Sequence, residues 1–83
     1  MAVKVTRHFR EETLPRRPYL AELMHRVAEA LEHPIRVEAQ PDGRTRRWVY
    51  CPEGRRYLRV VVDVDGETVH TAFYDRGYRP DRE

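Results

Sequence analysis

The fold of this chain is decided by the stretch from Arg56 to Arg79, which reads RYLRVVVDVDGETVHTAFYDRGYR. Apolar and polar residues alternate on both sides of Asp65-Gly66. This dipeptide favours a two-residue turn between antiparallel strands, because both of its residues accept a positive φ. The stretch therefore predicts a β-hairpin.

A two-residue turn at this place sorts the hairpin's side chains into two faces. It sets Val62 opposite Val69, Val60 opposite Thr71 and Leu58 opposite Phe73. These residues form an apolar face. The residues between them point the other way, since successive side chains of a strand alternate. The second face is polar, aromatic and titratable, and it holds Tyr57, Arg59, Val61, Asp63, Thr68, His70, Ala72 and Tyr74.

An amphipathic helix is predicted upstream, over about residues 18–32. Its apolar residues recur at helical spacing and form one stripe: Leu20, Leu23, Met24, Val27 and Leu31. Pro18 suits a first helical turn, where its missing N–H would have no partner in any case. Pro34 ends the helix, because a proline disfavours the α conformation in the residue before it.

Two further strands lie between the helix and the hairpin. The sequence predicts an α+β fold, with one main amphipathic helix (about 18–32) packed on a four-stranded antiparallel β-meander (about 35–40, 45–51, 56–64 and 67–75). A short loop after Cys51 sets Tyr50 opposite Tyr57, Val49 opposite Leu58 and Trp48 opposite Arg59. Cys51 falls on the core side. The helix covers only one face of the sheet, so the other face should carry the function.

We expect residues 1–83 to form a single small domain with irregular ends. Residues 1–17 are a variable segment, in which Val3 and Val5 favour a short strand and residues 8–14 equally favour one or two helical turns. Residues 76–83 are expected to form a loose tail.

Composition indicates a reducing compartment and no membrane span. The chain has a single cysteine, a net charge of +2 and no long apolar run, which together favour a cytoplasmic protein. The sequence shows no metal-ligand spacing and no cofactor motif. Lys4 is the only lysine, and so arginine supplies nearly all the positive charge. Arginine binds phosphate in a bidentate way and stacks on bases, although a GC-rich genome explains such a bias equally well.

The open face combines arginines with aromatic rings, as single-strand RNA recognition requires. The residues predicted to bind the substrate are Arg46, Trp48, Tyr50, Tyr57 and Arg76. The residues predicted to act in catalysis are His70 and His8 as acid and base, Arg59 on the phosphate, and Tyr74 in proton transfer or in stacking a base. The alternative is that cross-strand aromatic and arginine pairs only stabilise an exposed sheet.

The run RYLRVVVDVDGETVHTAFYDRGY, after an arginine-rich strand and a helix ending in a proline, resembles the small toxin-like nuclease domains of the barnase/EndoU/colicin/RelE-like group and related families. The resemblance covers about residues 48–79. It implies a metal-independent ribonuclease, with the group's last-strand threonine at Thr71, the following aromatic at Phe73 or Tyr74, its sheet arginine at Arg59 and its N-terminal histidine at His8. In the register above Thr71 lies on the apolar side, whereas the group's site requires it on the open side.

The leading hypothesis is therefore a small ribonuclease-like toxin that cleaves RNA without metal, with RNA and an antitoxin-like protein as partners. The alternatives are a module that binds RNA or protein without catalysis, and a structural homo-oligomeric domain.

Overall fold

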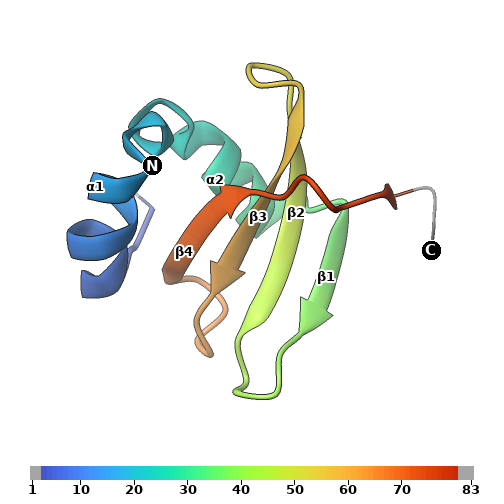
Figure 1. Cartoon of the computed structure of the whole chain (residues 1–83). Coiled ribbons are helices and arrows are strands. Elements are labelled where there is room, and N and C mark those ends of the chain that lie inside the picture. The colour runs from blue at the N-terminus through green and yellow to red at the C-terminus, as the bar shows by residue number, and fades with distance from the viewer. Residues whose placement is uncertain (1–2, 81–83) are drawn as a thin grey trace.

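The computed structural model describes residues 3–80, and its centre is a four-stranded antiparallel sheet of strand order β1-β2-β3-β4 (Figure 1). The strands are β1 (Arg36–Ala39), β2 (Thr45–Cys51), β3 (Arg56–Val62) and β4 (Val69–Tyr74). The predicted α+β class and the four-stranded meander are confirmed.

The predicted single helix over 18–32 is divided in two. A 3₁₀-helix, η2 (Pro18–Glu22), precedes the α-helix α2 (Met24–Glu32), and Leu23 between them has φ −112° and ψ 12°. In a 3₁₀ turn, side chains three residues apart lie above one another. Leu20 and Leu23 are so spaced, and both are buried. We therefore attribute the break in the helix to the packing of these two leucines in the core.

The N-terminal segment contains both of the structures that its sequence favours, a short extended stretch and a helical run. Val5 forms a parallel bridge with Val69 of β4. A helical run follows, made of η1 (Phe9–Thr13), which has π-helical hydrogen bonding, and α1 (Leu14–Arg16). Pro15 lies inside this run, where a proline removes one α-helical bond and clashes with the carbonyl four residues earlier. The wider π turn, in which the Leu14 N–H donates to the Phe9 carbonyl, accommodates it.

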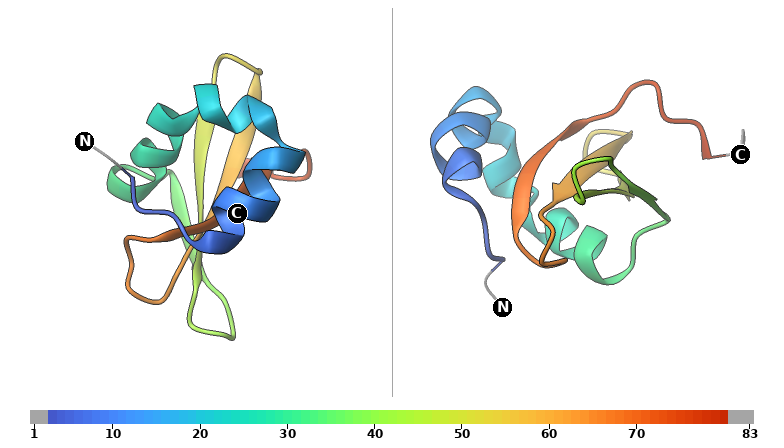
Figure 2. Two further views of the ribbon diagram at one scale, coloured as in Figure 1. Left: turned by 90° about the vertical axis from the view of Figure 1, so that its left-hand side faces the viewer. Right: turned by 90° about the horizontal axis from the view of Figure 1, so that it is seen from below.

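The core lies between α2 and one face of the sheet. It joins helical residues such as Leu20 and Val27 to strand residues such as Val49, Leu58 and Val60, and Phe9 of η1 completes it. Cys51 is fully buried, and this burial raises the pKa of its thiol to about 11. Figure 2 shows α2 on one side of the sheet and the chain after β4 on the other, while the N-terminal helical run lies beyond the β4 edge.

Between β2 and β3 the observed register is the predicted one, with Trp48 opposite Arg59, Val49 opposite Leu58 and Tyr50 opposite Tyr57. Between β3 and β4 only the pair Val62 and Val69 agrees.

The rest of the predicted β4 register is wrong by one residue. Val60 pairs with Ala72 rather than Thr71, and Leu58 pairs with Tyr74 rather than Phe73. A β-bulge causes the shift, because it leaves His70 as an extra residue between the pairs Val62–Val69 and Val61–Thr71. Beyond the bulge every β4 side chain changes face.

The predicted two-residue turn at Asp65-Gly66 is also wrong. The connection spans residues 63–68, and the Asp63 N–H donates to the Thr68 carbonyl at 2.7 Å. The carboxylate of Asp65 accepts the backbone N–H groups of Glu67 and Thr68 at 3.0 and 2.9 Å. Such local side-chain bonds compete with the strand ladder, which explains why the hairpin opens into a longer loop.

Candidate functional site

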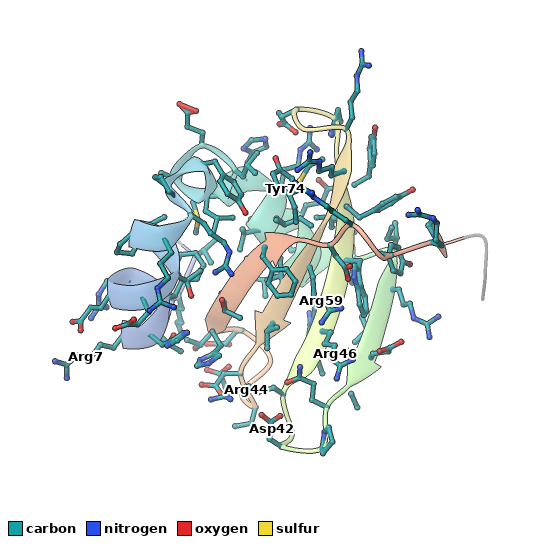
Figure 3. All side chains as sticks on the ribbon, in the orientation of Figure 1. Arg7, Asp42, Arg44, Arg46, Arg59 and Tyr74 are labelled. Atoms are coloured by element: carbon teal, nitrogen blue, oxygen red, sulfur yellow. The ribbon has the colours of Figure 1, made fainter. Side chains whose placement is uncertain are left out.

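The sheet face opposite α2, called the open face below, carries the residues from which any site must be built. Two elements partly frame it: η1 at the β4 edge and the segment 75–79 above β2 and β3. Its strand residues are Arg46, Trp48, Tyr50, Tyr57, Arg59, Val61, Thr71 and Phe73. Figure 3 shows Arg46 and Arg59 on this face, with Arg44 and Asp42 toward the β1–β2 turn.

Two histidines from opposite ends of the chain meet where η1 joins β4. The rings of His8 and His70 are stacked, with centroids 4.6 Å apart and planes inclined by 13°. Thr6 positions them, since its N–H donates to the Val69 carbonyl at 3.0 Å and its hydroxyl donates to the His70 carbonyl at 3.4 Å. The same hydroxyl oxygen accepts the Phe9 N–H at 3.1 Å and so starts the helix that carries His8.

His70 lies in surroundings that disfavour its protonated form. Its Nδ1 is buried and has no hydrogen-bond partner among the described residues. Burial, followed by the charges of Arg44 and His8, lowers the pKa of His70 below the ordinary 6.5. His70 is therefore a neutral imidazole at neutral pH. The nearby Arg44 contacts the carboxylates of Asp42 at 3.2 Å and Asp63 at 3.4 Å.

Across the middle of the open face, cations and rings alternate in one row. The Arg17 guanidinium lies 5.6 Å from the centroid of Phe73, and the Arg59 guanidinium lies 5.1 Å from Phe73 and 5.4 Å from Trp48. The ring of Tyr78 stacks on Trp48 at 5.0 Å. Each such contact contributes about 0.5–2 kcal/mol.

Asp75 anchors this row. Its Oδ2 accepts hydrogen bonds from the Trp48 indole at 2.9 Å and from Nε and Nη2 of Arg59 at 3.0 and 2.8 Å. Burial opposes ionisation of this carboxyl, but the bonds from Trp48 and Arg59 outweigh it and lower its pKa. Arg59 and Trp48 are therefore already engaged by a carboxylate of the same chain.

Trp48 was expected to offer an open stacking surface, and it does not. It is 3% exposed, because Tyr78 covers one part of its ring and Arg59 another. Tyr78 was expected to lie in the loose tail. Instead it packs on Trp48 and lies edge-on to Tyr57, with centroids 5.1 Å apart.

A pocket of about 460 Å³ lies between the sheet and the segment 75–79. Its sheet side is formed by Glu38, Arg46, Trp48 and Arg59, and its other side by Asp75, Gly77, Tyr78 and Arg79. Arg46 contacts Glu38 at 3.4 Å, whereas its buried Nε has no partner among residues 3–80.

The predicted site residues fall into separate groups. His8 and His70 form one pair, and Arg46, Trp48 and Arg59 border the pocket. Tyr50 and Tyr57 touch edge-on at 5.2 Å, with Tyr50 42% exposed. Arg76 lies exposed in the turn after Asp75.

Tyr74 is not on the open face, which corrects the prediction. The bulge turns it to the helix side, where it stacks on Tyr19 at 5.0 Å and lies beneath the Arg56 guanidinium at 5.6 Å. Burial raises the pKa of Tyr74, with smaller contributions from neighbouring groups.

Several residues of the open face were not identified as site residues from the sequence. They are Arg17, Arg44, Asp75, Tyr78 and Arg79, whereas Thr71 and Phe73 of the same face were expected from the resemblance. One local signal was present in the segment Asp75 to Tyr78. An aspartate two residues before a glycine favours a tight turn, and Oδ1 of Asp75 does accept the Gly77 N–H at 3.1 Å.

Within residues 3–80, no group of three or more His, Cys, Asp or Glu side chains is placed to hold a metal ion. None of the described helices is long and apolar enough to cross a membrane. In comparisons with known proteins, no family model, curated protein or solved structure matches this chain.

Proposed function

We propose that this chain is a small ribonuclease in which His8 and His70 transfer protons during metal-independent cleavage of RNA. The observation that carries the proposal is the stacking of these two histidines, 62 positions apart in the sequence, at the border of a face rich in arginine.

The chemistry requires a base for the 2′-hydroxyl proton, an acid for the leaving 5′-oxygen and positive charge near the phosphate. His70 suits the base, because its lowered pKa keeps it neutral at pH 7. His8 is exposed, so its ring is accessible to the leaving 5′-oxygen and takes the role of the acid in this proposal. The rings are stacked 4.6 Å apart, and the charge of His8 is one of the causes that lower the pKa of His70, which suits His70 to the role of base. The products would be a 2′,3′-cyclic phosphate and a free 5′-hydroxyl.

Among charged groups, Arg44 has the largest effect on the pKa of His70. The substrate phosphate would bind the Arg44 guanidinium in place of the carboxylate of Asp42 or Asp63. The bulge turns Thr71 to the open face, beside the arginines to which the proposal gives the substrate.

The test is cleavage of a fluorogenic RNA oligonucleotide by the full chain, with and without excess EDTA. We expect His8→Ala and His70→Ala each to lower the rate by at least about 100-fold, the usual contribution of general acid–base catalysis. His33→Ala is the matched control, since His33 is exposed at the end of α2. A substrate with a 2′-deoxy sugar at the cleaved position should resist cleavage. Cleavage that survives both substitutions, or that EDTA abolishes, would refute the proposal.

A second candidate is an RNA-binding module without catalysis. The row of cations and rings favours it, because Arg17 and Arg59 alternate with Phe73 and Trp48 without any need for a proton-transfer group. In that case the chain binds the uncleavable oligonucleotide and leaves the cleavable one intact. Arg59→Ala would then weaken binding while His8→Ala would not.

A further inference from the structure

The pocket under the segment 75–79 has no part in the proton transfer described above. A volume of about 460 Å³ falls within the range of about 300–1,000 Å³ usual for small-molecule sites. We infer that it binds one nucleotide of a single-stranded RNA, with the phosphate on Arg46 and the base on Trp48 in the place that Tyr78 now occupies. The choice of RNA rests on the proposed function.

Arg46 argues for an anionic ligand. Its buried Nε donates no hydrogen bond within the described part of the chain, and its contact with Glu38 is long, at 3.4 Å. Buried polar groups are nearly always satisfied in folded proteins, so an unsatisfied guanidinium nitrogen beside a pocket indicates an absent acceptor. Arginine pairs with both carboxylate and phosphate oxygens, and under the proposed function the absent acceptor is a phosphate.

The charge of the pocket agrees with this ligand. Three arginines border it, Arg46, Arg59 and Arg79, against the two carboxylates of Glu38 and Asp75. The difference of three and two leaves one positive charge, which an entering phosphate would balance.

Tyr78 argues for a base. Its ring lies on Trp48 with centroids 5.0 Å apart and planes inclined by 13°, as a stacked nucleobase would. The backbone hydrogen bond that holds Tyr78 is long, since its N–H donates to the backbone carbonyl of Asp75 at 3.4 Å. Asp75 is held separately by Trp48 and Arg59, so the turn stays anchored when Tyr78 leaves Trp48 and gives up its edge-on contact with Tyr57.

The pocket would hold a neighbouring nucleotide rather than the one cleaved. Arg59 borders the pocket, and Asp63, which contacts Arg44, lies four residues further along the chain. At the usual rise of an extended chain, this separation is about 13 Å. A single strand crossing the open face could therefore occupy both places.

Trp48 is the only tryptophan, and its fluorescence reports directly on the pocket. The experiment titrates the full chain with adenosine 5′-monophosphate, with adenosine alone and with inorganic phosphate. We expect the nucleotide to change Trp48 fluorescence and to bind at least 10-fold more tightly than adenosine or phosphate. Arg46→Gln should weaken nucleotide binding at least 10-fold, whereas Arg55→Gln, at an exposed turn position, is the matched control.

Tyr78 supplies the second arm. Tyr78→Ala removes the competing ring and should tighten nucleotide binding several-fold, while Tyr78→Phe keeps the ring and should bind like the unaltered chain. The inference fails if nucleotide changes the fluorescence of neither the unaltered chain nor folded Tyr78→Ala. It also fails if inorganic phosphate binds as tightly as the nucleotide, since the site would then recognise an oxyanion alone. The titration involves no cleavage, so its result is independent of whether the histidine pair is catalytic.

Discussion

His70 shows how one residue's position depends on a backbone irregularity. A regular hairpin would place it in the ladder of β4, but the bulge makes it the extra residue and brings it against His8. Bulges often re-aim side chains beside functional sites. At this position the buried Nδ1 has no hydrogen-bond partner within the described part of the chain, and burial lowers the pKa of the imidazole.

The stability of the chain should depend on His70 near neutral pH. Because its pKa is lowered in the folded state, the unfolded chain binds the proton more readily, and stability present above pH 6.5 is lost as the pH falls. We expect the free energy of unfolding, measured with urea, to decrease between pH 7.5 and 5.5, and to decrease less in His70→Gln. The lowered carboxyl pKa values of Glu53 and Asp65, both about 2, act at far lower pH. An identical decrease in both proteins would contradict the assignment.

At the scale of elements, the N-terminal helical run is fastened to the sheet by a polar contact as well as by Phe9. The hydroxyls of Thr13 in η1 and Thr71 in β4 lie 2.9 Å apart, and Thr13 is 2% exposed. This contact holds the helix that carries His8 against the strand that carries His70. The predicted register placed Thr71 in the core, where it could not have formed this bond.

Substitutions at these threonines should be strongly non-additive. Thr13→Val leaves the Thr71 hydroxyl without its partner and should cost about 1–3 kcal/mol of unfolding free energy. Replacing both residues with valine removes donor and acceptor together, and should recover most of that loss, since valine has the same shape. Urea unfolding of the two single variants and the double variant measures the coupling. Additive losses would show that the hydroxyls do not interact.

At the scale of the whole molecule, the arginines are largely neutralised by nearby acids. The net charge is +2, and ion pairs join Arg36, Arg44, Arg46 and Arg59 to carboxylates. Such a surface attracts nucleic acid weakly at long range. Under the proposed function, RNA binding would therefore depend on a few contacts at short range.

The salt dependence of RNA binding should reflect those few contacts. Of Arg44, Arg46, Arg59 and Arg79, three or all four would contact phosphates, and each contact contributes about −0.7 to the slope of log K against log salt for a single strand. We expect a slope between about −2 and −3 for a short RNA, measured by fluorescence anisotropy with the His8→Ala variant to prevent cleavage. A slope steeper than about −5 would indicate binding spread over the whole surface.

Much of the architecture is determined by local pattern. Alternation places the β2–β3 pairs correctly, and the apolar stripe identifies the helical face that covers the sheet, because period-2 and period-3.6 burial need only the chain itself. The same reasoning identified His8 and His70 as the candidate acid and base, as residue types suited to the chemistry.

The tertiary structure alone decided which of those residues meet. The bulge at His70, the burial of Trp48 under Tyr78 and the removal of Tyr74 to the helix side all depend on contacts between segments far apart in the sequence. A strand's alternation carries no information about where one extra residue will be inserted, and one insertion exchanges the two faces beyond it. Local periodicity thus determined the layers of this protein, and long-range packing decided the composition of its open face.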